Sequence, residues 1–297
     1  MADSHALDSV YSFHGGPPLN VWERCSLQSF ADHGHDIVLF SYDQLDVPRG
    51  VRLESAADII SLEERDKFFA LAPGAYAQFS DFFRYQLLLQ RGGWWVDTDV
   101  LCRSPILPSQ PVVVGETRAG KLCGAIMRFP PGHKLLKEAL DYSRDHQRGL
   151  SEAHRTVIGP ILLSDLIKSH PIAVSDRRLF FPLRAKDVWR FGEPSDAAAV
   201  EKEVEASPMV HWFQEFFRAA GLPRDLLPPA GSYLANAFVA HGGAGVTHIS
   251  LDEYRAYAPG GKKRSSAKRK NKKKQAPRRG LLRSLWNRLR GGRSKPR

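Results

Sequence analysis

Two aspartates separated by one residue, Asp97 and Asp99, directly follow the apolar residues 92–96 (Gly-Gly-Trp-Trp-Val). Carboxylate oxygens are preferred ligands of hard cations such as Mg²⁺ and Mn²⁺, which usually also keep water or phosphate oxygens as ligands. An Asp-x-Asp turn can supply one direct ligand and a second carboxylate that acts through water or a ribose. We predict Asp99 as the direct ligand and Asp97 as the second carboxylate. A solvated acidic turn is the alternative.

A cation held by these carboxylates suits a nucleotide-sugar as substrate. Cleavage of the sugar–phosphate bond adds negative charge to the leaving diphosphate, and a divalent metal ion neutralises such charge. A bare Asp-x-Asp is common in proteins, so its specificity depends on the elements that position it.

The first part of the chain alternates between strand and helix patterns. Residues 10–13 and 36–42 are short runs rich in strand-forming residues, and residues 20–33 between them carry apolar residues at helical spacing. This order predicts a β-α-β unit that opens an α/β sheet.

A second helix is expected just before the two aspartates. Ser80 and Asp81 have the short oxygen-bearing side chains that cap a helix, and Gly92 tolerates the positive φ that ends one. Residues 94–96 then form a strand whose carboxyl end carries the aspartates, the place where ligands of open α/β sheets bind. Further strands are expected at 112–114 and 125–127, helices at 133–142 and 160–168, and a polar, acidic connector at 194–208.

The pattern of residues 80–85 (Ser-Asp-Phe-Phe-Arg-Tyr), Leu88, 92–93 and 97–99 resembles the core of glycosyltransferase family 32. This family is named for a sugar-binding region with a DXD motif and is related to bacterial glucosylating toxins. Weaker similarities lie at residues 14–18, 125–133, 159–160 and 210–212, so the resemblance covers roughly residues 10–255.

The resemblance implies an α/β fold of the GT-A type, with a Rossmann-like nucleotide-sugar-binding domain and a mixed central sheet over residues 1–258. It also implies transfer of a sugar from a nucleotide donor to a hydroxyl group, usually with retention at the anomeric carbon. Asp97 and Asp99 would then be the catalytic pair, working through positioning and charge stabilisation rather than as a nucleophile.

Matching positions suggest further roles. Asp81 and Arg84 would bind hydroxyls of the donor sugar, a local ion pair being the alternative. His211 would complete the metal site with the two aspartates, or serve as a hydrogen-bonded structural histidine. The nucleotide would contact Phe13, His14, Gly15 and Asp97.

The sequence departs from the family pattern at two places. Some members have an Ile-Trp pair at the end of the first strand, where this chain has Ser12 and Phe13. The late segment of the family often ends in Ser-Trp, whereas Gln214 follows closely on His211 here, so no serine ligand is assigned.

Together these features predict a glycosyltransferase of the hexosyltransferase type that depends on Mn²⁺ or Mg²⁺. The resemblance favours a UDP-sugar as the donor, with a GDP-sugar next. The expected acceptor is a hydroxyl of a glycan or lipid-linked acceptor in cell-envelope polysaccharide synthesis, such as lipopolysaccharide. The alternative is a non-catalytic sugar-binding remnant whose basic tail binds nucleic acid.

The positive charge of the chain is concentrated in its last residues. Of 43 Lys and Arg, 17 lie in residues 259–297, which contain no acidic residue; the remaining 26 face 32 Asp and Glu, a net charge of −6. Residues 281–290 have the pattern of a basic amphipathic helix. We expect residues 262–290 to bind an anionic membrane surface. Nucleic acid is less favoured, and a solvated or partner-binding tail is the third possibility.

The N-terminal residues lack the features of a signal peptide, and no apolar run is long enough for a membrane-spanning helix. We therefore expect a cytoplasmic protein that associates peripherally with the inner face of the plasma membrane. Cys25, Cys102 and Cys123 are widely spaced and are expected to be free thiols, packed as small core residues.

Overall fold

The computed structural model describes residues 9–118, 120–151, 154, 156–170 and 172–259. The strands are β1 (Val10–Phe13), β2 (Ile37–Ser41), β3 (Arg52–Ser55), β4 (Gly93–Val96), β5 (Val100–Cys102), β6 (Val113–Arg118), β7 (Lys121–Phe129) and β8 (Met209–His211). The α-helices are α1 (Val21–Asp32), α2 (Leu62–Leu71), α3 (Tyr76–Arg91), α4 (Lys134–Asp145), α5 (Leu162–Leu166), α6 (Ala197–Val204), α7 (Gln214–Ala220), α8 (Tyr233–Phe238) and α9 (Leu251–Tyr257).

Shorter helical segments connect these elements. The 3₁₀ segments are η2 (Ala56–Asp58), η5 (Ile167–Ser169), η6 (Arg177–Leu179), η7 (Ala185–Gly192) and η8 (Pro194–Asp196), and the π segments are η4 (Val157–Ile161) and η9 (Val239–Gly243).

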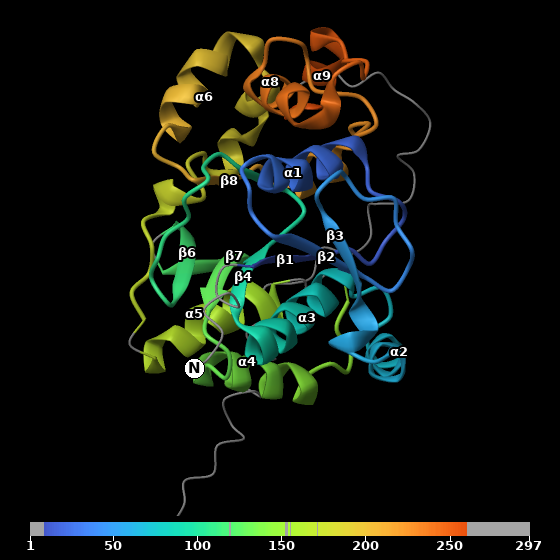
Figure 1. Cartoon of the computed structure of the whole chain (residues 1–297), viewed down its shortest axis with the longest axis vertical. Helices are drawn as coiled ribbons and strands as arrows, with labels where there is room; N and C mark the ends of the chain where they lie inside the picture. The colour runs from blue at the N-terminus through green and yellow to red at the C-terminus, as the bar shows by residue number, and fades with distance from the viewer. Residues whose placement is uncertain (1–8, 119, 152–153, 155, 171, 260–297) are drawn as a thin grey trace, which may run out of the picture. The chain divides into compact units, whose positions relative to one another are not determined.

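Six strands form the central sheet in the order β3-β2-β1-β4-β7-β6. The first four are parallel, and β7 pairs antiparallel with both β4 and β6. Parallel strands need crossover connections, and α1 provides the crossover between β1 and β2 (Figure 1). The predicted α/β class with a mixed central sheet is confirmed.

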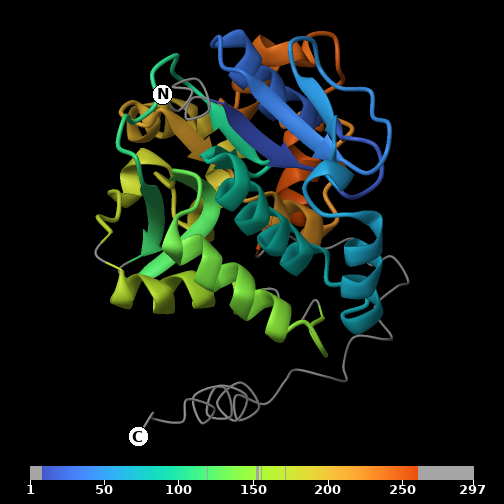
Figure 2. The ribbon, with the colours of Figure 1, turned by 60° about the horizontal axis from the view of Figure 1, so that its bottom comes forward.

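Helices cover both faces of this sheet. Side chains alternate along a strand, so Tyr11 points into the core shared with α3 and α4, while Val10 points into the core shared with α1. Figure 2 shows α3 and α4 side by side on the face opposite α1. A third cluster joins α1 to the C-terminal helices, with Trp22 packed edge-on against Trp212.

Helix α1 begins as its sequence predicts. The side chain of Asn20 accepts hydrogen bonds from the backbone N–H groups of Trp22 and Glu23, and the Glu23 carboxylate accepts from the Asn20 N–H. This reciprocal cap satisfies backbone donors that a helix N-terminus otherwise leaves unpaired.

The start predicted for the helix before the two aspartates, at Ser80 and Asp81, was wrong. Ser80 and Asp81 lie inside α3, which begins at Tyr76 after Gly74 and has no side-chain cap. Phe79 explains the earlier start, because its ring packs against Phe82 and extends the buried face of the helix by one turn. The two polar side chains are consequently available to the site described below.

The predicted connector at residues 194–208 was also wrong, since α6 occupies most of it. Three consecutive alanines favour helix. Val200 and Val204, four residues apart on one helical face, are both fully buried in the C-terminal cluster.

Within the described ranges no helix combines the length and apolar character needed to cross a bilayer. The predicted amphipathic helix at 281–290 and the rest of the basic tail from residue 260 onward lie outside the described residues.

Candidate active site

The carboxyl end of β4 and the two-stranded sheet β5–β8 bring three ligand-type side chains together. Asp97 follows β4 directly, Asp99 precedes β5, and Val100 of β5 pairs with His211 of β8. Each of these residues offers one ligand atom, and the three atoms lie within 4.8 Å of one another: those of Asp97, Asp99 and His211. The sheet pairing thus places a distant histidine beside the Asp-x-Asp turn.

Asp99 is held by the last residue of β8 and by the segment that follows it. His211 Nε2 lies 3.0 Å from Asp99 Oδ2, and the Gln214 backbone N–H donates to the same oxygen at 2.8 Å. The Trp212 N–H donates to the Asp99 carbonyl at 3.1 Å.

Phe213 makes the turn that presents the Gln214 N–H to Asp99. Its φ of 57° and ψ of 59° are left-handed, and it is the only described non-glycine residue with positive φ. Such conformations cost a bulky residue about 1–3 kcal/mol and cluster at functional sites. Its ring centroid lies 4.2 Å from that of His211.

Arg84 from α3 occupies the centre of the site. Its Nη2 lies 3.1 Å from Asp97 Oδ1 and 3.4 Å from Asp81 Oδ1. Nη1 donates to the Gly124 carbonyl at 2.5 Å, and the guanidinium carbon lies 4.9 Å from the centre of the Trp95 ring. With only 5% of Arg84 exposed, this buried cation is fixed between two carboxylates.

Asp81 is confined by close approach of the η4 backbone. A Cβ added to Gly159 would lie 2.8 Å from Asp81 Cγ, a separation that real Cβ atoms essentially never show. The fit between Gly159 and the carboxylate requires a residue without a side chain.

Burial and neighbouring charges separate the pKa values of the three carboxyl groups. Burial raises the pKa of Asp81 to about 7, against the opposing effect of Arg84. Burial likewise raises the pKa of Asp97, although Arg84 opposes it. For Asp99 burial is outweighed by His211 and by the Gln214 N–H, so its pKa is lowered.

His211 gains a proton more readily than an ordinary histidine. Burial disfavours the charged ring, but the adjacent Asp99 carboxylate outweighs burial and raises the pKa of His211. Because a metal ligand must be deprotonated, a cation bound at this pair would displace the proton from His211.

The residues fit a divalent cation. Two carboxylates and one imidazole are a donor set that Mn²⁺ accepts, and Nδ1 of His211 is buried without a hydrogen-bond partner among the described residues. Trp95 Nε1 donates to Asp97 Oδ1 at 2.8 Å, which orients that carboxylate. The cation would share this carboxylate with Arg84.

These groups line one cavity of about 1250 Å³. All eight residues predicted for the site line it: Phe13, His14, Gly15, Asp81, Arg84, Asp97, Asp99 and His211. Arg84 and Asp81 do form an ion pair, but they form it in the cavity wall and together with Asp97.

Sequence reasoning missed some contributors and misjudged others. Gln214 was set aside because it is not the serine of the family pattern, yet its backbone N–H binds Asp99. The sequence alone allowed Trp94 or Trp95 to stack on a substrate while the other packs in the core, but both are buried and offer no exposed ring face. On the rim of the cavity, Tyr76 and Phe216 are exposed aromatic residues that no local pattern indicated.

All three cysteines are free thiols, as predicted. Cys25 and Cys102 are buried, whereas Cys123 is partly exposed and lines the cavity. Burial raises the pKa of each thiol to about 12.

Residues 22–118, about one third of the chain, match the family described as "Glycosyltransferase sugar-binding region containing DXD motif". No curated protein matches the chain. A solved structure described as "PaToxG Glycosyltransferase" is 13% identical with a TM-score of 0.43, covering 80% of this chain and 87% of that one. The apo-form glycosyltransferase GlyE of Streptococcus pneumoniae TIGR4 is 12% identical with a TM-score of 0.40, covering 70% and 54% respectively.

The matched segment includes four of the eight predicted site residues, namely Asp81, Arg84, Asp97 and Asp99. Over this third of the chain, residues 22–118 are similar to a glycosyltransferase sugar-binding region, and the match includes the DXD motif.

Proposed function

We propose that the chain transfers a sugar from a nucleotide-sugar to an acceptor hydroxyl with the help of one divalent cation. The observation that carries this proposal is the convergence of Asp97, Asp99 and His211 at one wall of the cavity. Mn²⁺ or Mg²⁺ held there would neutralise the charge that develops on the leaving diphosphate.

Asp81 and Arg84 are proposed to hold the donor sugar. Both residues are 5% exposed and line the cavity, so hydrogen bonds to sugar hydroxyls would form in a largely dry environment. Because Arg84 also contacts Asp97, the groups for the sugar and for the cation are rigidly linked. Such linkage lowers the entropic cost of aligning the reacting bond.

Phe13, His14 and Gly15 are proposed to contact the nucleotide. The Phe13 ring stacks on Phe83 with centroids 4.4 Å apart, and a Cβ at Gly15 would lie 2.8 Å from Phe13 Cζ. The loop therefore runs close over an anchored aromatic ring at the end of β1. A UDP-sugar is the proposed donor, and retention is the proposed outcome.

The size of the cavity leaves room for the acceptor. Single small-ligand sites span about 300–1000 Å³, and this cavity is about 1250 Å³. We propose a hydroxyl of a glycan or lipid-linked acceptor in envelope polysaccharide synthesis as the acceptor.

Donor turnover tests this function. Purified full-length protein would be assayed for hydrolysis or transfer of UDP-sugars with and without Mn²⁺, beside Asp97→Asn and Asp99→Asn. We expect each variant to lose at least about 100-fold in turnover, the scale of removing one transition-state charge partner. His248→Gln, whose Nδ1 hydrogen bonds to the Pro228 carbonyl outside the cavity, is the control. Equal turnover in all four proteins would contradict the proposed roles of Asp97 and Asp99, and no turnover by the wild type would favour a non-catalytic sugar-binding domain.

A further inference from the structure

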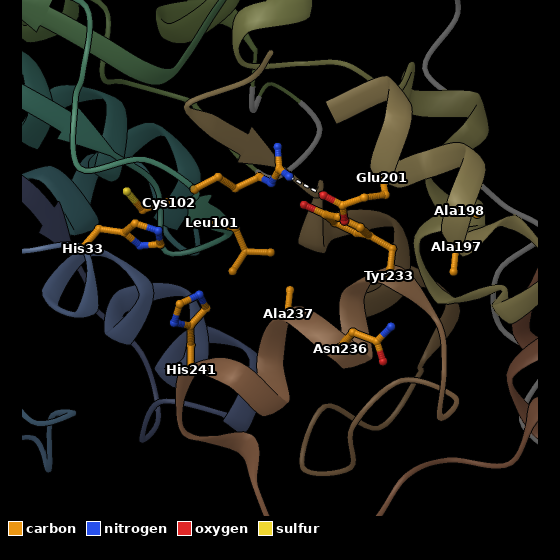
Figure 3. A pocket seen from close by; sticks show the side chains of 11 residues that line it. His33, Leu101, Cys102, Ala197, Ala198, Glu201, Tyr233, Asn236, Ala237 and His241 are labelled. Carbon is orange, nitrogen blue, oxygen red and sulfur yellow. Dashed lines mark hydrogen bonds and ion pairs between the residues drawn. The ribbon is translucent and has the colours of Figure 1, made fainter. Parts of the chain in front are cut away.

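Figure 3 shows a second cavity, of about 470 Å³, in the described part of the chain. Among the described residues, none that lines this cavity also lines the first one. Its walls come from the end of α1, β5, α6, α8 and η9. His33 and His241 lie next to each other at one end of it, with ring centroids 5.6 Å apart and planes inclined by 49°.

The hydrogen-bond partners fix the tautomer of both rings. His33 Nδ1 lies 2.7 Å from the Ser29 carbonyl oxygen, which can only accept, so Nδ1 carries the proton. His241 Nδ1 lies 2.8 Å from Asp32 Oδ2, and a carboxylate likewise accepts. Each neutral ring is left with a lone pair on Nε2, and neither Nε2 atom has a hydrogen-bond partner among the described residues.

This arrangement is the one found around metal-bound histidines. A ligating imidazole almost always donates its other ring N–H to a carboxylate or a backbone carbonyl, which orients the ring and increases its basicity. Here one ring has the carbonyl partner and the other has the carboxylate partner. With metal–nitrogen bonds of about 2.0–2.1 Å, the centres of two imidazoles on one tetrahedral ion lie about 5–6 Å apart, which includes the observed 5.6 Å.

We propose that His33 and His241 bind a borderline transition-metal dication, Zn²⁺ being the reference case, through their Nε2 atoms. Asp32 and the Ser29 carbonyl orient the two rings. Imidazole ligands favour such ions over the Mg²⁺ or Mn²⁺ preferred by carboxylates. Cys102 also lines the cavity, but its thiol donates to the Ser104 carbonyl at 3.3 Å and is not assigned as a ligand.

The position of the pair predicts what the metal does. His33 is the C-cap of α1, and His241 lies at the non-helical kink of η9, followed by Gly242 at φ 92°. A metal ion shared by His33 and His241 would join the end of α1 to η9. The described residues provide two ligands, His33 and His241, so the remaining coordination positions would face the cavity and take water. The site depends on this geometry alone and is independent of the proposed sugar transfer.

Calorimetric titration of the full-length protein with Zn²⁺ at pH 7.5 tests the proposal. The titrations would be made in an Asp99→Asn background, to weaken binding at the active site. We expect His33→Gln and His241→Gln each to weaken Zn²⁺ binding at least tenfold. His248→Gln is the control and should leave Zn²⁺ binding unchanged, because His248 also hydrogen bonds to a backbone carbonyl but lies outside this cavity. Unchanged affinity and stoichiometry in both test variants would overturn the proposal.

A second measurement needs no variant. Crystals of the wild-type protein grown with Zn²⁺ would be measured at the zinc absorption edge. We expect an anomalous peak between His33 Nε2 and His241 Nε2. Anomalous density at Asp97, Asp99 and His211 without any at this pair would overturn the proposal, and would do so without bearing on sugar transfer.

Discussion

At the scale of single residues, the site is governed by how burial acts on charge. Asp81, Asp97 and Asp99 are all acidic, yet their pKa values shift in different directions because their partners differ. Arg84 serves two carboxylates at once, whereas Asp99 has His211 and a backbone N–H to itself. A cavity wall built in this way holds one carboxyl group whose pKa is lowered beside two whose pKa values are raised.

Asp81 makes the stability of the metal-free protein depend on pH. Its folded pKa of about 7 exceeds the ordinary value of 3.8, so between these values the folded chain holds a proton that the unfolded chain has released. Stability therefore falls as the pH rises through this window. We expect Asp81→Asn to gain stability relative to wild type, on the order of a few kcal/mol between pH 4 and pH 8.

Denaturant unfolding at a series of pH values measures this difference. Ser80→Ala, a change in the adjacent residue that removes no titratable group, should differ from wild type by the same amount at every pH. A constant difference between Asp81→Asn and wild type would show that Asp81 titrates in the folded protein as it does in the unfolded chain.

At the scale of elements, the site depends on backbone segments that meet from distant parts of the chain. Helix α3 supplies Asp81 and Arg84, the end of β4 supplies Asp97, and the β5–β8 pair brings in His211. The π segment η4 closes over Asp81 through Gly159. Each element positions one or two side chains of the site, so a substitution within one element is expected to displace the side chains of that element first.

Gly159→Ala is predicted to disturb the donor-sugar site alone. The added methyl group would overlap the Asp81 carboxylate and push it from Arg84. We expect the KM for the donor to rise at least tenfold while Mn²⁺ affinity stays within twofold of wild type. Gly192→Ala is the matched control, because its methyl group would lie 2.5 Å from Tyr254 Oη, remote from the cavity. Its folded fraction should decrease without a change in KM. An unchanged KM in Gly159→Ala would contradict this placement of Asp81.

The same division explains what could be predicted from the sequence. The elements β1, α1, β2 and β4 follow from local patterns, because an apolar run, a capping Asn20 and a helix-ending Gly92 act on their neighbours. The start of α3 required knowing that Phe79 packs in the core. The pairing of Val100 with His211 joins segments far apart in the sequence and has no local signal. His211 was found through a family resemblance instead.

At the scale of the whole molecule, charge is divided between an acidic body and a basic end. Residues 259–297 carry 17 Lys and Arg, and we propose that residues 262–290 bring the enzyme to an anionic membrane surface. Each basic residue near such a surface contributes about 1 kcal/mol. Residues 281–290 add apolar contacts that phosphate binding alone does not need.

Truncation tests this division of roles. The full chain and a chain ending at residue 258 would be compared for sedimentation with liposomes containing 30% phosphatidylserine, and for binding to duplex DNA at matched salt. We expect liposome binding to be lost on truncation, and donor hydrolysis to stay within twofold of the full chain. Loss of DNA binding with unchanged liposome binding would contradict the membrane proposal and favour nucleic acid.

The central claim is that Asp97, Asp99 and His211 hold one divalent cation at the diphosphate of the donor. Electron paramagnetic resonance of Mn²⁺, titrated into the full-length protein with UDP present, measures that cation directly. We predict one bound Mn²⁺ for each wild-type chain, with affinity reduced at least tenfold in Asp99→Asn and in His211→Gln. Equal Mn²⁺ binding by wild type and both variants would contradict it.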